Sequence, residues 1–263
     1  GIDPLERAEK YGADALRFNL ITGNSPGNDT RFYTEKCEAM RNFANKIWNA
    51  SRFVMMNLTI DKCELPAADA LAPEDKWVLS KLNTLVKEVT ENLDAYEIGV
   101  ASAKVYDFLW DTYCDWYIEL TKTRLQGEDE GAKLAAQNVL CFVLTELLKL
   151  LHPFMPFITE EIYQALPHEE QFIMTSRWPE YRADLAFPEE EAAMEAVMDT
   201  IKAIRARRAE MNVPPSRKAE VLIVTATPDV YAQGRHFIQR LAYASEVKFA
   251  DAAPADVLSL IHI

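Results

Sequence analysis

The segment Ala132–Leu151 most constrains the fold, because it is apolar on nearly every side when it is drawn as a helix. A helix that is apolar all round lies inside a protein or spans a membrane. Its uncharged window, Leu134–Leu144 and a little beyond, is too short for a bilayer, which requires about 20 apolar residues. The segment therefore predicts the buried central helix of a bundle and no membrane partner.

Caps, prolines and apolar spacing predict further helices on both sides of this segment. Pro73 opens one of them, with Glu74 and Asp75 in its first turn. The helices predicted up to Glu169 cover residues 4–11, 13–22, 40–57, 73–93, 97–125, 132–151 and 159–166.

The pattern changes after Glu169, where an extended stretch is followed by helix, strand, helix and strand. This order predicts a small α/β unit after the bundle. The expected fold class is mainly α, a helical bundle with a small α/β subdomain at the C-terminus. The expected parts are residues 1–33, a bundle over 34–168, an extended linker over 169–188, the α/β subdomain over 189–250 and a tail over 251–263.

Composition excludes several classes of protein. The net charge is −13, which argues against a general nucleic-acid coat but allows local basic patches. The four cysteines form no CxxC pair, so free thiols in a reducing, cytoplasmic compartment are expected. No phosphate loop, nucleophile elbow or metal-ligand spacing is present, so no catalytic residue and no metal site is predicted.

One face of the helix Met40–Asn57 is unusual. Its apolar stripe lies opposite an arc rich in amide and basic side chains, although asparagine is a poor helix former. From Arg31 to Asn57 five basic residues stand against two acidic ones. Such a face suggests an anionic partner such as nucleic acid, and the alternative is a solvated face of a bundle helix. The arc contains Asn42, Asn45, Lys46, Asn49 and Arg52.

A second basic patch lies between Lys202 and Lys218, with six basic residues against one acidic. Arg208 falls within the apolar stripe of the helix Glu189–Met211 and Arg205 lies at its edge, so both require an anionic partner. That partner is either an internal carboxylate, or phosphate or another domain. The patch comprises Lys202, Arg205, Arg208, Arg217 and Lys218.

The aromatic run Tyr106–Tyr117 has two interpretations. Aromatic rings can stack nucleic-acid bases, but aromatics at helical spacing more often form bundle core. Asp111 and Asp115 within it are expected to pair with basic neighbours. His152, just before Pro153, is interpreted as a helix C-cap.

Several motifs together are similar to a known family. They are GADALR (12–17), RNFANKIWNASRF (41–53), DKWVLSKLN (75–83), DFLWDTYCDWYIELTK (107–122), LLHPFMPFITEEIY (150–163) and IRARRAEMNVPPSRKAE (204–220). The set resembles the C-terminal half of bacterial valyl-tRNA synthetases, which are class I aminoacyl-tRNA synthetases. The likeness covers about residues 1–250, and Asp256–Ile263 does not match the family.

The resemblance implies a helical module that binds the tRNA anticodon stem and loop, preceded by a stem-contact segment over 1–33. It implies that the catalytic domain of the same full-length chain, with its ATP and magnesium chemistry, lies before Gly1, so this segment alone is expected to be inactive. For valine the anticodon has A in the middle and C at the third position. The alternatives are the same module of an isoleucyl-tRNA synthetase and a structural or protein-interaction domain.

The residue pattern and the family resemblance both indicate that the arc of the helix Met40–Asn57 binds RNA. RNA loops are read by stacking and by hydrogen bonds to base edges, while phosphate contacts fix position. The arc offers amides for bases, and Lys46 and Arg52 for phosphates. Arg31, Lys36 and Arg41 are expected as further phosphate contacts on the approach to the arc.

Overall fold

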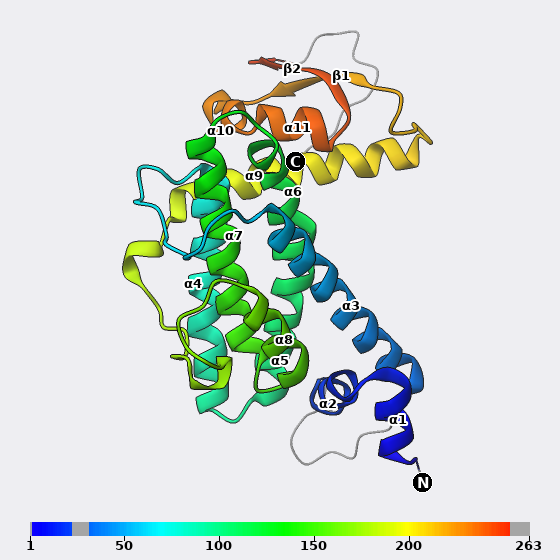
Figure 1. Ribbon diagram of the computed structural model, residues 1–263. Coiled ribbons are helices and arrows are strands. Elements are labelled where there is room, and N and C mark those ends of the chain that lie inside the picture. The colour runs from blue at the N-terminus through cyan, green and yellow to red at the C-terminus, as the bar shows by residue number, and fades with distance from the viewer. Residues whose placement is uncertain (1, 23–31, 253–263) are drawn as a thin grey trace. The chain divides into compact units, whose positions relative to one another are not determined.

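The computed structural model describes residues 2–22 and 32–252. The chain forms two compact units, Gly1–Ala186 and Phe187–Ile263 (Figure 1). The first is helical and the second contains a small parallel sheet, so the predicted fold class is confirmed.

The first unit is built from helices. Its α-helices are α1 (Pro4–Tyr11), α2 (Ala13–Ile21), α3 (Thr34–Asn57), α4 (Pro73–Asp94), α5 (Ile98–Asp107), α6 (Ile118–Leu125), α7 (Glu130–Leu151) and α8 (Pro156–Ala165). A π-helical segment, η1 (Phe108–Tyr117), joins α5 to α6, and two 3-10 turns follow as η2 (Ile173–Thr175) and η3 (Ala183–Leu185).

Helix α7 is the centre of the first unit, as its sequence predicts. It packs against α3, α4, α5, α6 and α8 (Figure 1). The sequence estimate that it is too short for a bilayer was wrong, because its 22 residues are long and apolar enough to cross one, but 72% of its most apolar window is buried inside the structure. Burial among neighbouring helices therefore accounts for its apolar character.

The long helix predicted over residues 97–125 is continuous, but its middle differs from the expectation. Phe108–Tyr117 adopts π-helical geometry, which is rare and usually shorter. Tyr113 and Tyr117 are fully buried, and the Tyr113 hydroxyl donates to the Leu140 carbonyl at 2.9 Å. The aromatic run is therefore largely core, and nothing in its residue spacing predicted the wider turn.

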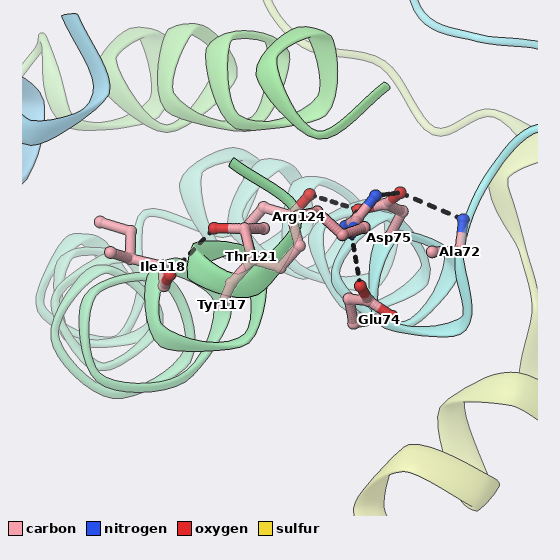
Figure 2. Close-up of polar contacts among 7 residues, drawn as sticks. All are labelled: Ala72, Glu74, Asp75, Tyr117, Ile118, Thr121 and Arg124. Atoms are coloured by element: carbon pink, nitrogen blue, oxygen red, sulfur yellow. Dashed lines mark hydrogen bonds and ion pairs between the residues drawn. The ribbon is translucent and has the colours of Figure 1, made fainter. Parts of the chain in front are cut away.

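A buried polar cluster joins the start of α4 to the end of the continuous helical segment formed by α5, η1 and α6 (Figure 2). Asp75 is fully buried and accepts hydrogen bonds from Arg124 Nη2 at 2.5 Å and Nη1 at 2.8 Å. The Tyr117 hydroxyl donates to the same carboxylate at 2.6 Å, and the Ala72 amide donates at 3.1 Å. Glu74 Oε1 lies 2.7 Å from Arg124 Nε as an ion pair, although the angle is unfavourable for a hydrogen bond.

The cluster changes the acidity of its members. Burial raises the pKa of Glu74 to about 7, and the nearby Arg124 opposes this shift. Burial disfavours the charge on Arg124, but hydrogen bonding and attraction to Asp75 outweigh burial and raise its pKa. Arg124 therefore stays charged, while Glu74 is half-protonated near neutral pH.

Side chains of α2 hold the turn between α7 and α8. Asp14 accepts from the backbone amides of Ile158 at 2.7 Å and Phe157 at 3.3 Å, which caps the start of α8. Arg17 donates to the carbonyls of Pro153 and Phe154, both at 3.2 Å. The motifs GADALR and HPFMPF, distant in sequence, therefore form one junction.

The segment expected as an extended linker is attached to the bundle. The segment contains the two 3-10 turns η2 and η3. Two hydrogen bonds, of 2.6 and 2.7 Å, join the backbone of its Arg182 to the side-chain amide of Asn83 on α4. Trp178 Nε1 donates to Thr90 Oγ1 at 2.9 Å. The division between the two compact units follows Ala186.

The second unit contains α9 (Pro188–Glu210), β1 (Ala219–Val224), α10 (Pro228–Gln233), α11 (Arg235–Leu241) and β2 (Ala244–Ala250). The strands pair in parallel, and α11 contacts both β2 and α9 (Figure 1). The helix predicted between the two strands is divided at Gly234 into α10 and α11. A Cβ atom there would lie 2.5 Å from Val197 Cγ2, so only glycine permits this approach to α9.

We predict that Asp75→Asn lowers the free energy of unfolding by about 3 kcal/mol, because it removes the carboxylate that accepts two hydrogen bonds from the largely buried Arg124 guanidinium and leaves only the Glu74 ion pair. Urea unfolding followed by circular dichroism measures the change. Asp94→Asn, an exposed substitution on the same helix, is the control and should change stability little. Equal stability of the two variants would contradict the role given to Asp75.

We predict that Glu74→Gln removes part of the pH dependence of stability. The folded pKa of Glu74 lies above its ordinary 4.5, so the native state holds a proton that the unfolded state releases. Its contribution is complete below pH 4.5 and is lost as the pH rises through 7. Between these limits the wild type should lose up to roughly 1.4 kcal/mol per pH unit relative to Glu74→Gln. Urea titrations at pH 5 and pH 8 test this, and parallel pH profiles would contradict it.

Candidate nucleic-acid interface

Helix α3 separates its faces as the sequence predicts. Phe43, Ile47 and Val54 are buried against the bundle. The opposite arc is open to solvent, with four of its five predicted members exposed: Asn42, Asn45, Asn49 and Arg52. The arc is therefore a surface and not a sealed helix–helix contact.

The arc forms one wall of an open groove of about 490 Å³, whose other wall comes from η1 and α6. Residues four apart on each wall face the groove, which is the spacing of one helical face. The lining residues are Asn42, Asn45, Lys46, Asn49, Ala50 and Phe53 from α3, and Cys114, Ile118 and Lys122 from η1 and α6.

Three asparagines give the groove its chemical character. Among the described residues, the side chains of Asn42, Asn45 and Asn49 form no hydrogen bond. Asparagine costs helix stability relative to alanine, so the fold gains nothing from three of them here. Each amide offers two donors and one acceptor to an incoming polar group.

Lys46 differs from the expectation of a free cation. Its ammonium lies 2.7 Å from Asp115 Oδ1 and 3.8 Å from the centre of the Trp110 ring, and its side chain is only 23% exposed. The predicted pairing of Asp115 with a basic neighbour is therefore confirmed. Lys46 is already paired, whereas Arg52 forms no ion pair or ring contact with the residues that the structure describes.

Aromatic rings from α2, α3, α5 and η1 form a column that contacts Lys46 through Trp110. The Phe43 and Tyr106 rings lie 4.4 Å apart, and Tyr106 stacks on Trp110 at 5.8 Å. Phe18 of α2 extends the column, 5.5 Å from Phe43. Stacked rings fix the position of Trp110 and therefore of the Lys46 ammonium above it.

The other basic residues expected near the arc have separate roles. The Lys36 ammonium donates to the Thr22 carbonyl at 2.7 Å, at the end of α2. Arg41 lies over the Tyr11 ring at 5.8 Å. Arg31 lies outside the described residues. The charge available beside the groove is therefore smaller than the sequence count suggests.

The second wall of the groove, formed by η1 and α6, was not predicted from the sequence. Phe53 is half-buried in the groove with the Lys122 ammonium 5.6 Å from its ring, and Lys122 also pairs with Glu119. Lys122 and Ile118 belong to the motif CDWYIELTK, four residues apart. That spacing placed them on one helical face, but only the fold brings this face opposite α3.

The basic patch of the second unit is partly structural. Arg205 Nε donates to the Leu241 carbonyl at 2.6 Å, and Arg208 Nη2 donates to the carbonyls of Pro214 and Arg217 at 2.9 and 2.6 Å. Uncharged backbone oxygens thus bind both guanidinium groups, where an anion was expected. Lys202 pairs with Asp199 at 2.9 Å, while Arg217 and Lys218 are exposed.

Reactive groups offer no catalytic centre within the described residues. Burial raises the pKa of Cys114 in the groove to about 12, so its thiol stays protonated and weakly nucleophilic. His152 at the end of α7 contacts Thr159 Oγ1 at 2.7 Å, and burial lowers its pKa. No group of three metal-binding side chains occurs in this part of the chain. The geometry is suited to binding.

Comparison with known proteins identifies the family of the chain. Residues 75–223 match the family model "Anticodon-binding domain of tRNA ligase", which is more than half of the chain. The chain therefore belongs to this family of anticodon-binding domains. Helix α3 precedes the matched range.

Curated relatives are more specific. The chain is 54% identical to valine–tRNA ligases of Clostridium tetani and Clostridium acetobutylicum over 99% of its length, and 47% identical to that of Bacillus cereus over 94%. It spans about 30% of the two clostridial proteins. It thus corresponds to an anticodon-binding segment of a valine–tRNA ligase.

Solved structures show the same fold. A LeuRS–tRNA–LeuAMS complex from Agrobacterium radiobacter aligns with a TM-score of 0.55 at 21% identity, covering 71% of this chain and 22% of that one. Free methionyl-tRNA synthetase of Mycobacterium tuberculosis aligns with a TM-score of 0.51 at 21% identity, covering 61% and 34%.

We predict that Asn45→Ala and Asn49→Ala keep or raise stability, by about 0.5 kcal/mol each, because alanine is the better helix former and no hydrogen bond is lost. Thermal unfolding measures the change. Asn83→Ala is the contrasting substitution, because the Asn83 amide is buried and bonded to Arg182, and it should be clearly destabilising. A loss above about 1 kcal/mol at Asn45 or Asn49 would mean that these amides serve the fold.

Proposed function

We propose that the groove between α3 and the η1–α6 wall receives the anticodon loop of valine tRNAs, as part of a full-length valine–tRNA ligase. The observation that supports this most is the set of three exposed, unpaired asparagine amides beside the Phe53 ring. Amides hydrogen-bond to base edges, and rings stack on unpaired bases.

The size and charge of the groove support a loop over a duplex. An open groove of about 490 Å³ accommodates splayed bases, whereas an A-form helix hides its base edges in a deep, narrow groove. Two lysines of the groove are paired with carboxylates, so amides and ring surface dominate its interior. Arg52 at the edge supplies a cation for the phosphate backbone.

The remaining chemistry would belong to the rest of the enzyme. Valine activation with ATP and magnesium would take place in the catalytic domain of the same full-length chain, in the cytoplasm. This segment would act by positioning, because correct docking of the anticodon places the acceptor end for transfer. The 263-residue chain alone should show no valine-dependent pyrophosphate exchange.

The test compares three anticodon stem-loop RNAs in filter-binding titrations at fixed salt. One carries a valine anticodon, one an isoleucine anticodon and one a scrambled loop of the same length. Tighter binding of the valine loop is expected. Equal binding of all three would overturn sequence reading and favour a structural or protein-interaction role, while preference for the isoleucine loop would reassign the substrate.

We predict that Arg52→Ala weakens binding of the valine stem-loop and flattens the dependence of log K on log salt by about 0.7 to 0.9, the slope for one phosphate contact. Titrations at several salt concentrations measure the slope. Arg177→Ala is the control, because this exposed arginine lines a different pocket between α4 and α7. An unchanged slope for Arg52→Ala would remove Arg52 from the binding surface.

A further inference from the structure

We propose that Asp115 is a specificity-determining residue of the groove, because it holds the Lys46 ammonium away from RNA phosphates. This inference rests on the proposed function and names one residue that makes the groove selective. Asp115 lies on η1 directly after Cys114, which lines the groove wall opposite the asparagine arc.

The contacts of Lys46 define a held cation. Its ammonium is 2.7 Å from Asp115 Oδ1 and stands 3.8 Å above the Trp110 ring, which the aromatic column fixes in place. Both partners, Trp110 and Asp115, belong to η1. The Lys46 ammonium therefore contacts two side chains of η1, although Lys46 is one of the residues that line the groove.

A released Lys46 would bind differently. A lysine ammonium is a point charge that attracts any phosphate, and phosphate contacts carry no sequence information. The groove would then hold every RNA loop more tightly and would lose relative preference for base edges. Asp115, whose side chain is 51% exposed, would also repel a phosphate that approaches Lys46.

This arrangement explains why a carboxylate lies beside a site for an anionic partner. Exposed ion pairs contribute little to stability, so the pair is poorly explained as a device for folding. Specificity is a difference between affinities, and it improves when attraction shared by all competitors is removed. The pair removes such shared attraction while leaving the three asparagine amides free.

The experiment measures binding of the 263-residue chain to the valine stem-loop and the scrambled stem-loop over a range of salt. For Asp115→Asn, both RNAs should bind more tightly, and the salt slope should steepen by about 0.7 to 0.9 for both. The ratio of the two affinities should fall toward one. Adding Lys46→Met to Asp115→Asn should return the slope to its wild-type value.

Asp111→Asn is the matched control. Asp111 is an exposed carboxylate on the same π-helical segment, and its substitution makes the same change in net charge without releasing Lys46. If Asp111→Asn steepens the slope as much as Asp115→Asn, general charge explains the effect and the proposal is overturned. Lys46→Met in the wild-type background should leave the slope nearly unchanged, and a drop as large as that of Arg52→Ala would also overturn it.

The outcomes separate this inference from the function beneath it. If the wild type prefers the valine loop and Asp115→Asn keeps the same preference and slope, the role of Asp115 is wrong and anticodon recognition stands. If the wild type shows no preference, the proposed function fails first. Thermal unfolding of each variant checks that it is folded, and an exposed pair of this kind should cost less than about 1 kcal/mol.

Discussion

The fold of the first unit depends on one buried carboxylate. Asp75 at the start of α4 binds both the Arg124 guanidinium and the Tyr117 hydroxyl (Figure 2). These partners lie at the ends of η1 and α6, the same segments that supply one wall of the groove. Because an unpaired buried charge is very unfavourable, only a packing that brings all three groups together is stable. The interaction thus fixes the groove wall without taking part in binding.

The groove proposed to bind RNA belongs to an acidic chain. The net charge of −13 would repel RNA at long range, but charges farther apart than about 8 Å are largely screened at physiological salt. Close to the surface the amides and Arg52 therefore dominate. Pairing of Lys46 with Asp115 lowers the cationic character further, which under the proposed function favours contacts that distinguish one base from another.

Periodicity allowed much of this to be predicted from the sequence. The apolar stripe of α3 and the all-round apolar character of α7 each follow from local spacing, so both helices were predicted, although α3 begins at Thr34 and not at Met40. The π-helical geometry of Phe108–Tyr117 was not predicted, because it arises from packing and leaves no residue signature. The anionic partners predicted for Arg205 and Arg208 were also wrong. Both side chains donate to backbone carbonyl oxygens, which a count of charged side chains does not include.

The sequence by itself determined the helices, the exposed asparagine arc and the family, since these depend on residue types at fixed spacing along one chain. The tertiary structure alone decided that Lys46 faces Asp115, 69 positions away, and that Phe53 faces the wall of Ile118 and Lys122. The physical reason is that a helix pattern states which side of each helix is polar. It does not state which two polar sides meet, because that choice is made by core packing and by the buried charge at Asp75.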